Sequence, residues 1–435
     1  MLFVHYLKRL VSSRSQPTID QPSGPKNEPQ LRLMVLTQFF PPDFAPTGQL
    51  IEELTRHLSQ QGLDVDIFTG QPGYAFQATD APRLEQVDSL KVRRSRTAQL
   101  WPQRIRGKAI NGILFLLRTV LHLVGCGRKT ELLLITTAPP FLPVVGYFAN
   151  LIFRVPYVCL LYDLYPDIAV KLGVIPEQHW LARFWQNMNL RVWRRAKGIV
   201  VLSPAKKQHI TQLCPGIESK VSVIHSWANP DLIVPIPKQE NWFALRYGLI
   251  QPFTVLYSGN LGRCHDVETF LEAAILLKDE PIKFVCIGNG AKRQVLMEKR
   301  EQLGLSNLLL LPYQDKEVLP YSLTACDLSL VSLSPGMERL LAPSKLYSAL
   351  AAGRPIAVVC PPKSYLKDLV QKTNCGRAIA NGDGQGLADF IRQLAGDRPL
   401  AEGMGQAGRR YLEENFTPQR IAAQYLEVLQ NSVKR

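Results

Sequence analysis

The amino-acid sequence predicts an α/β protein built from two doubly wound, Rossmann-like domains. Short continuous apolar runs alternate with segments of helical apolar spacing, first from residue 31 and again from residue 253. Continuous apolar runs are typical of parallel strands that are buried on both faces. Several runs end in glycine-containing loops, which is where doubly wound sheets bind ligands. We therefore expect two parallel sheets that face a central cleft.

The first series of elements predicts an amino-terminal domain over residues 31–235. A helix is expected over 49–62, where apolar residues recur at helical spacing and Gly62 provides a carboxyl-terminal cap. Residues 15–30 are rich in Pro, Ser and Gln, so residues 1–30 are expected to form a flexible tail. The expected strands are 31–37, 63–70, 131–137, 157–163 and 198–203.

The second series predicts a carboxyl-terminal domain over 236–415, joined to the first by a linker near 229–242, where Pro and polar residues cluster. The segment 418–433 has an apolar stripe at helical spacing and predicts a final helix within 416–435. A further helix is expected over 266–277. The expected strands are 253–259, 308–313, 327–333 and 355–360. A further strand is expected within 282–290, a range that includes the loop after it.

The charge of the chain is strongly positive and unevenly distributed. The net charge is +15, and residues 89–130 contain ten Lys or Arg and no Asp or Glu. Such a block indicates an anionic partner. The apolar run 110–125 follows most of these charges, a pattern typical of a helix lying in a membrane interface, so the segment 91–125 is expected to meet an anionic membrane surface. The alternative is an ordinary buried helix beside a solvated basic loop.

Other partners and compartments are less well supported. No segment reaches the roughly 18 apolar residues of a membrane-spanning helix. Nucleic acid is not an expected partner, because the positive charges are interleaved with Leu, Ile and Phe. The eight cysteines are scattered without a C-x-x-C motif, and the amino terminus lacks the order of a signal peptide. The expected location is cytoplasmic, peripheral on the inner face of the cell membrane.

Two glycine loops and one helix start predict a diphosphate site in the second domain. The loop 259–263 carries two glycines and Arg263 after a strand, and the loop 288–290 ends the next strand. The stretch LLAPSKLYSALAAGRPIAVV (340–359) predicts a turn, a helix opened by Pro343 and a buried strand. Lys345 at that helix start suits an anion in front of it. The alternatives are an exposed Arg263 in a tight turn and a solvated Lys345 whose stem covers apolar surface.

Three stretches of the sequence resemble glycosyltransferase family 4: GQLIEELTRHLSQQGLDVDIFT, YSGNLGRCHDVETFLEAA and the segment from LLPYQDKEVLP to AAGRPIAVV. "SGNLGR", "APSKLYSALAAGRP" and "LYDLYPD" are similar to the branch that assembles colanic acid and O-antigen polysaccharides. The resemblance covers about residues 31–430. It implies the GT-B fold, retaining transfer from a nucleotide-diphosphate sugar bound in the second domain, and an acceptor bound in the first. It also implies that the final helix crosses back to the first domain.

The resemblance implies site residues position by position. The implied catalytic residues are Arg263, Lys345 and Asp163, of which Asp163 could instead cap a turn near Pro166. No metal or other cofactor is expected, because cationic side chains replace a divalent metal and the nucleotide sugar is a substrate. The implied acceptor-binding residues are Thr47, Gly48 and Tyr162. The implied donor-binding residues are Gly259, Asn260, Gly262, Gly288, Asn289, Tyr313, Pro343, Ser344, Leu346 and Ser348.

The sequence also departs from the pattern of the family. Asn260 and His265 stand where many members have Arg and Lys. Leu340 and Ser348 stand where many have a pair of glutamates, and Glu338 lies two residues from the first of these positions. Tyr162-Asp163 replaces the frequent His-Asp.

The function implied is a glycosyltransferase acting on a lipid-linked or saccharide acceptor. Two alternatives remain open from the sequence. One is a nucleotide-sugar epimerase of the same fold. The other is a binding or scaffold protein that has lost its glutamate pair and with it catalysis.

Overall fold

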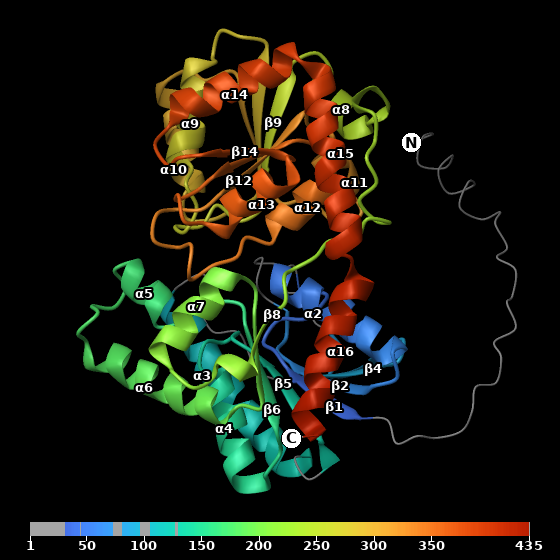
Figure 1. The fold of residues 1–435 in the computed structure, drawn as a ribbon, viewed down its shortest axis with the longest axis vertical. Coiled ribbons are helices and arrows are strands. Elements are labelled where there is room, and N and C mark those ends of the chain that lie inside the picture. Colours follow the sequence, from blue (N-terminus) through green and yellow to red (C-terminus); the bar gives the residue numbers. More distant parts are fainter. Residues whose placement is uncertain (1–30, 44, 73–80, 96–104, 127–128, 435) are drawn as a thin grey trace, which may run out of the picture. The chain divides into compact units, whose positions relative to one another are not determined.

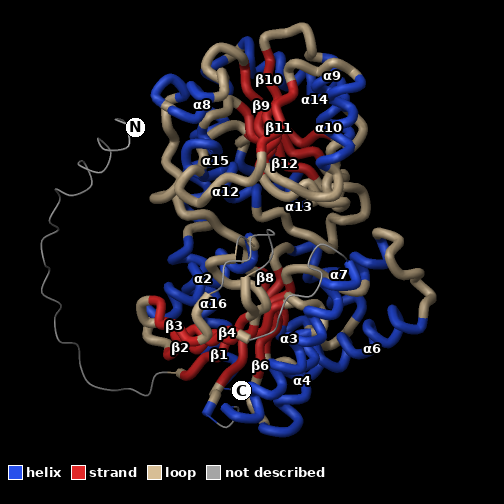
Figure 2. The backbone as a smooth tube through the Cα atoms, turned by 180° about the vertical axis from the view of Figure 1, so that it is seen from behind, coloured by secondary structure: helices blue, strands red, loops and turns tan. Residues whose placement is uncertain are grey.

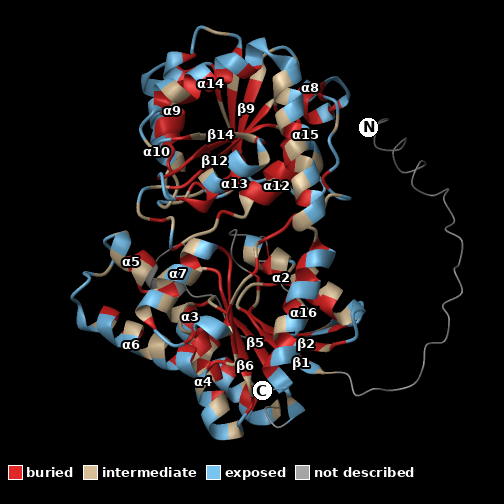
Figure 3. Cartoon of the chain, viewed as in Figure 1, coloured by how far each residue is buried: buried red, intermediate tan, exposed pale blue. Residues whose placement is uncertain are grey.

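The computed structural model describes residues 31–43, 45–72, 81–95, 105–126 and 129–434. Leu31–Arg435 form one compact unit that contains two separate, mainly parallel sheets (Figure 1). Helices lie on both faces of each sheet, as Figure 2 shows from the opposite side. The strands form the buried centre of each domain and the outer helix faces are exposed (Figure 3). The predicted doubly wound architecture is confirmed.

The first sheet has eight strands in the order β3-β4-β2-β1-β5-β6-β7-β8. All neighbours pair in parallel except β3 and β4, which form an antiparallel edge. The strands are β1 (Arg32–Leu36), β2 (Asp64–Thr69), β3 (Leu84–Val87), β4 (Leu90–Arg94), β5 (Leu132–Thr136), β6 (Tyr157–Leu161), β7 (Gly198–Val201) and β8 (Val221–Val223).

The helices of the first domain cover both faces of this sheet. Helices α3, α4 and α6 pack together on one side, and α2 packs against the final helix on the other. The helices are α2 (Pro46–Gln60), α3 (Ile105–Cys126), α4 (Leu142–Phe153), α5 (Asp167–Lys171), α6 (Trp180–Arg195), α7 (Pro204–Leu213) and the 3₁₀ turn η2 (Glu218–Lys220).

The second sheet is entirely parallel, in the order β11-β10-β9-β12-β13-β14. Its strands are β9 (Phe253–Ser258), β10 (Ile282–Ile287), β11 (Leu308–Leu311), β12 (Leu328–Ser332), β13 (Ile356–Val359) and β14 (Gly376–Ile379). Its helices are η3 (Lys238–Glu240), α8 (Trp242–Arg246), α9 (Glu268–Leu276), α10 (Arg293–Gln302), α11 (Leu319–Thr324), α12 (Lys345–Ala351), α13 (Tyr365–Thr373), α14 (Gly384–Gly396) and α15 (Arg398–Asn415).

The last helix, α16 (Pro418–Lys434), packs on the first domain although it follows the second in sequence. It contacts α2 and strands β5, β6 and β7. Its apolar stripe explains this position, because Ile421, Tyr425 and Leu429 are buried against that domain. The indole N–H of Trp227, in the loop after β8, donates to Glu53 Oε2 of α2 at 2.6 Å.

The largest difference from the sequence prediction is at the edge of the first sheet. Residues 90–94 form β4. In the sequence, the Lys and Arg residues of this strand belong to a basic block without acidic neighbours. The acidic partners come from other strands, because Lys91 Nζ lies 3.0 Å from Asp64 Oδ1 and Arg94 pairs with Glu85 at 2.5 Å. Part of the positive block is therefore neutralised within the protein. Arg96 and Arg104 lie outside the described residues.

Candidate donor site

The loops that follow β9 and β10 are packed directly against each other by glycine. Gly288 has φ 142°, and a Cβ there would lie 2.0 Å from the carbonyl oxygen of Gly259. Gly290 has φ 148°, and its Cβ would lie 2.6 Å from the carbonyl oxygen of Leu261. Residues with a side chain rarely adopt such φ values. These two positions therefore require glycine both for their backbone conformation and for the lack of space for a Cβ.

Hydrogen bonds extend this packing to the third strand of the sheet. The Gly259 N–H donates to Ile287 O at 2.9 Å, and the Gly288 N–H donates to Leu311 O at 3.0 Å. The Leu261 N–H donates to Asn289 O at 2.9 Å, and the Tyr313 hydroxyl donates to the same oxygen at 3.3 Å. The structure therefore brings Gly259, Asn289 and Tyr313 together at the carboxyl ends of adjacent strands, the usual ligand-binding edge.

Lys345 reaches this edge from the start of α12. Its Nζ donates to the Tyr257 hydroxyl, lies 3.4 Å from Asn260 O and sits 4.0 Å from the centre of the Tyr257 ring. The Tyr257 hydroxyl donates onward to Asn260 O at 2.9 Å. This chain of contacts fixes the ammonium beside the 259–263 loop, so the alternative of a freely solvated Lys345 is wrong.

Burial of the ammonium lowers the pKa of Lys345 to about 7. Burial also lowers the pKa of His265 to about 3, and the charges of Lys345 and Lys292 add to that shift. His265 is thus neutral, with its Nδ1 donating to Ser332 O at 2.9 Å. The site holds a cation whose charge is incompletely compensated, an arrangement that favours a bound anion.

Arg263 lies in the same loop that Lys345 touches, three residues after Asn260. It is exposed and makes no hydrogen bond or ion pair with any described residue. The loop is fixed at its amino end, where the Gly259 N–H donates to Ile287 O, and at its carboxyl end, where the Cys264 carbonyl accepts from the Ser334 N–H. A free guanidinium on a fixed loop can bind an anion without first breaking an ion pair.

The predicted residues around α12 are placed less favourably. The helix begins at Lys345 rather than Pro343, whose ring is buried. Leu346 is a core residue, and its N–H already donates to Pro343 O at 3.3 Å. The Ser348 hydroxyl donates to Lys345 O at 3.1 Å. Leu346 therefore offers a ligand no free group, while Ser344 is half-buried with a free hydroxyl among the described residues.

Two cationic residues near the loops were missed from the sequence. Arg293 Nη1 donates to both Gly288 O and Leu311 O at 3.1 Å, directly behind the glycine loop. Lys292 Nζ donates to His265 O at 2.7 Å and pairs with Glu268. Their position two and three residues after "GNG" in the sequence was the available signal.

Glu338 supplies a carboxylate in the loop before α12. One carboxylate oxygen, Oε2, is buried and has no hydrogen-bond partner among the described residues. Leu340 instead lies in the core. The loop is tied to the Arg263 loop by the Ser334–Cys264 hydrogen bond at 2.9 Å. The family pattern expects a glutamate in this loop. In this chain the carboxylate stands in the same loop, two residues before the expected position.

Asp163 stands at the carboxyl end of β6 in the first domain. Its carboxylate makes no hydrogen bond with the described residues, so the turn-cap alternative is wrong; its N–H donates to the Thr137 hydroxyl at 3.2 Å. Burial raises the pKa of Asp163, and the charge of Lys206 opposes that shift.

Lys206 was missed because its sequence context, just after a helix cap, is typical of a surface lysine. It is fully buried, donates to the carbonyl oxygens of Leu161 and Tyr162, and burial lowers its pKa to about 8.

The predicted acceptor residues are only partly available. The Tyr162 side chain points into the core, and its buried hydroxyl has no partner among the described residues. Gly48 faces the protein rather than a ligand: a Cβ there would lie 3.0 Å from the Phe39 carbonyl carbon, and its N–H donates to Ala45 O. Thr47 is half-buried, with a free hydroxyl among the described residues.

Comparison with known proteins decides the family. Residues 249–411 match the sequence model described as glycosyl transferases group 1, and residues 47–227 match that of the glycosyl transferase 4-like domain. Together the matches span most of both domains. The chain belongs to glycosyltransferase family 4. It is a glycosyltransferase, as the resemblance of its motifs predicted.

Two relatives and two solved structures illustrate the similarity. WbjE of Pseudomonas aeruginosa, named as a glycosyltransferase, is 25% identical over 68% of this chain and 74% of its own. WcaI of Escherichia coli K12, named as a colanic acid biosynthesis glycosyl transferase, is 38% identical over 40% of this chain and 42% of its own. The fold matches HepE of Anabaena (TM-score 0.69, 17% identity, 92% of this chain and 100% of HepE). It also matches WaaG (TM-score 0.68, 16% identity, 92% and 99%), so the predicted GT-B fold is confirmed.

Proposed function

We propose that this glycosyltransferase moves a sugar, with retention of configuration, from a nucleotide diphosphate to an acceptor used in surface-polysaccharide assembly. The observation that carries the proposal is the fixed Lys345 ammonium, 3.4 Å from Asn260 O in a glycine-lined loop that also carries the free Arg263. The solved HepE structures contain UDP or UDP-glucose, and the WaaG and WcaI names refer to lipopolysaccharide and colanic acid biosynthesis. A uridine diphosphate sugar is therefore the first donor to test.

The chemistry follows from where negative charge develops. When the bond between the sugar and the diphosphate breaks, negative charge builds on the departing phosphate oxygens. Fixed cations near those oxygens stabilise the transition state more than the ground state, because they need no rearrangement as the charge forms. Lys345 and Arg263 would fill this role from two different elements. In this proposal they take the place of a divalent metal.

The departing phosphate can also accept the proton of the acceptor hydroxyl on the same face of the sugar. This arrangement retains the configuration and demands little acid–base machinery. Glu338 would hydrogen-bond the sugar hydroxyls through its carboxylate, one oxygen of which has no partner among the described residues. Asp163 would contact the acceptor or the sugar. The positive charge of Lys206 would favour the ionised form of its carboxylate.

The experiment is a screen of nucleotide sugars for turnover with extracted lipid-linked saccharides, with and without EDTA. We expect transfer from one donor, unaffected by EDTA, and a roughly tenfold or greater loss in Arg263→Ala, as for removal of one transition-state charge contact. The exposed Arg300, on α10, provides the matched control Arg300→Ala, which should retain full activity. A soluble epimerised nucleotide sugar, or no turnover of any donor, would contradict the assignment.

We further propose that α3 and α4 dock on an anionic bilayer and that the acceptor is lipid-linked. The two helices pack together, and their outer faces are apolar yet exposed. Arg118 and Arg154 are exposed beside them. None of the helices in the described residues is long and apolar enough to cross a membrane, so the contact would be interfacial. The exposed apolar residues of this α3–α4 face are Ile113, Leu117, Val120, Leu121, Val124, Phe148, Leu151 and Ile152.

Substituting three of these residues tests the docking. We expect Leu117→Ser/Leu121→Ser/Ile152→Ser to reduce co-flotation with phosphatidylglycerol vesicles at least tenfold. Each apolar side chain that enters the bilayer contributes about 1 kcal/mol or more to the binding free energy. The side chains are 58%, 67% and 69% exposed, so the variant should fold. The control replaces Leu245, Val295 and Leu303, which are exposed apolar residues of the second domain. Equal flotation of both variants would remove the membrane role from this face.

A further inference from the structure

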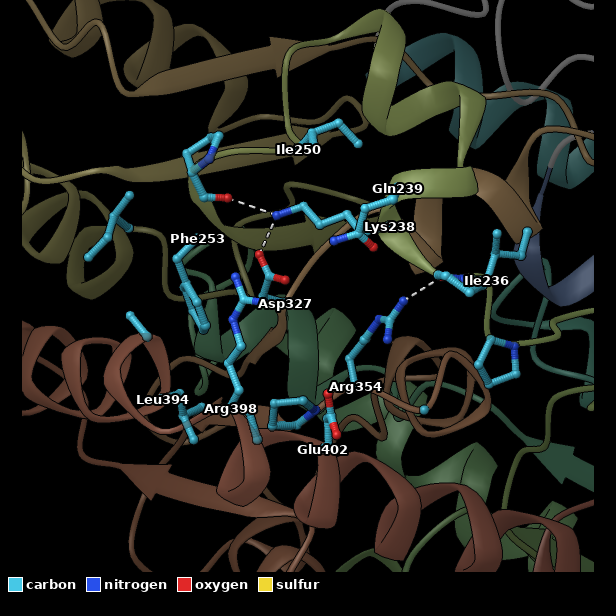
Figure 4. Close-up of a pocket in the computed structure, with 18 of the residues that line it drawn as sticks. Ile236, Lys238, Gln239, Ile250, Phe253, Asp327, Arg354, Leu394, Arg398 and Glu402 are labelled. Carbon is cyan, nitrogen blue, oxygen red and sulfur yellow. Dashed lines mark hydrogen bonds and ion pairs between the residues drawn. The ribbon is translucent and has the colours of Figure 1, made fainter.

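Two lysines of the described residues are buried, and their charges are compensated in different ways. Lys238 lines a cavity of about 890 Å³ in the second domain and pairs there directly with Asp327, as Figure 4 shows. Lys206, in the first domain, has no exposed surface and no carboxylate within ion-pair distance among the described residues. A buried charge without a direct partner is costly to keep. Lys206 therefore calls for an explanation that Lys238 does not.

The position of Lys206 in helix α7 adds to this cost. Lys206 is the third residue of the helix, and its N–H donates to the hydroxyl of the capping residue Ser203 at 3.2 Å. The positive end of the helix dipole lies in this first turn and disfavours an ammonium group. Burial lowers the pKa of Lys206 to about 8, so the side chain is still mainly charged at neutral pH. The protein thus maintains a positive charge where both burial and the helix oppose it.

The ammonium group of Lys206 contacts the backbone at the carboxyl end of β6. Its Nζ donates to Tyr162 O at 2.5 Å and to Leu161 O at 3.4 Å. These are the two residues that precede Asp163. An ammonium group has three N–H donors and no acceptor, so these contacts leave one donor unused. The lysine therefore holds in place the backbone that carries Asp163.

The charge of Lys206 also acts on the Asp163 carboxylate. Burial raises the pKa of Asp163, and the charge of Lys206 opposes that shift. The other carboxylate of the loop after β6 has a different partner, because Asp167 Oδ1 lies 2.9 Å from Nε2 of His209 on α7. The carboxylate that Lys206 affects is therefore the one that has no hydrogen-bond partner among the described residues.

Asp163 also lies close to the candidate donor site. Its charge adds to the effect of burial, which raises the pKa of Cys264 to about 11. Cys264 directly follows Arg263 in the loop after β9. A carboxylate accepts hydrogen bonds from hydroxyl groups most strongly when it is ionised. The ionisation state of Asp163 therefore determines how well it can orient a sugar hydroxyl at this site.

We propose that Lys206 is a positioning residue of the transfer reaction, which holds Asp163 in place and in its ionised form for contact with the sugar or the acceptor. The inference rests on the proposed function, in which Asp163 makes that contact. The lysine does not touch a substrate itself, because it has no exposed surface. Its hydrogen bonds and its charge both act through Asp163.

Infrared titration measures the effect of Lys206 on Asp163 without turnover. The carboxyl band of Asp163 is the band that Asp163→Asn removes. In Lys206→Met, which removes the charge, we expect the midpoint of this band to rise by about one pH unit or more, as is typical when a carboxylate loses a nearby cation. Lys206→Gln, which can still donate to backbone carbonyls, should show the same rise. Half-buried Lys207, the next residue of α7, provides the control Lys207→Gln, which should match the wild type.

Steady-state kinetics with the donor identified in the screen test the role of Lys206 in transfer. The acid limb of kcat/KM should move to higher pH in both Lys206 variants, with a loss of about tenfold on that limb and little change above it. Asp163→Asn should lower kcat, and adding Lys206→Met to it should cause little further loss, because the lysine acts through the carboxylate. Circular dichroism checks that each variant is folded.

An unchanged Asp163 midpoint in both Lys206 variants would overturn the proposal. Additive losses in Asp163→Asn/Lys206→Met would also overturn it, since they are expected of a lysine with a purely structural role. Absence of turnover by the wild type is a distinct result. It would count against the proposed function, and the infrared midpoints would still decide whether Lys206 controls the ionisation of Asp163.

Discussion

Lys345→Met is expected to lower kcat/KM for the nucleotide-sugar donor by about a hundredfold or more. The ammonium is held beside Asn260 O by the Tyr257 hydroxyl, so it is already in place when charge develops on the diphosphate. Loss of one such fixed donor typically costs about 3 kcal/mol in the transition state. Steady-state kinetics with the identified donor measure the effect. Lys363, an exposed lysine before α13, provides the control Lys363→Met, which should behave as wild type.

The pH profile separates this role from a structural one. Because burial lowers the pKa of Lys345 to about 7 in the free enzyme, the charged form is lost as the pH rises above 7. Since kcat/KM reports ionisations of the free enzyme, it should fall with rising pH between about 7 and 9. Lys345→Arg keeps its charge throughout this range, so its profile should be flat even if its rate is lower. A wild-type profile that is flat between pH 6 and 9 would contradict the role assigned to Lys345.

Glu338→Gln is expected to lower kcat by about tenfold or more with little change in the binding of nucleoside diphosphate. Its carboxylate is proposed to contact the sugar, one of its oxygens has no hydrogen-bond partner among the described residues, and an amide is a weaker acceptor than a carboxylate. The nucleoside diphosphate lacks the transferred sugar that Glu338 would contact, so its affinity should hold. Rapid-mixing turnover and calorimetry with the diphosphate measure the two quantities.

The matched control is Glu317→Gln, since Glu317 is exposed and unpaired among the described residues. Leu340→Glu would also restore a glutamate at the position usual in the family, but Leu340 lies in the core and the variant is expected to be destabilised. Unchanged kcat in Glu338→Gln, with the control also unchanged, would show that the shifted glutamate does not contact the sugar.

The strands could be predicted from the sequence because strands buried on both faces are continuous apolar runs. The ten predicted strands are present within a few residues of their expected bounds. Short strands at a sheet edge or next to it, such as β14 and β4, carry charged or small residues, so their sequence does not stand out from a loop. Glycine loops mark where strands end, which is why the 259–263 and 288–290 loops were found.

The tertiary partners could not be predicted. Nothing in the local sequence shows that Lys206 is buried beneath Asp163, or that Asp64 and Glu85 neutralise part of the basic block. Leu346 was assigned to the donor site by its place in a motif, yet helical periodicity turns its side chain into the core. Glu338 was set aside because of its sequence register, whereas a loop can present a carboxylate from a neighbouring position.

A crystal structure with a bound nucleoside diphosphate would test the central idea most directly. The arrangement of the loops predicts that oxygens of the diphosphate lie within about 3.5 Å of both Lys345 Nζ and the Arg263 guanidinium, in front of Gly259. A diphosphate bound elsewhere, with both cations left in contact with water alone, would contradict it.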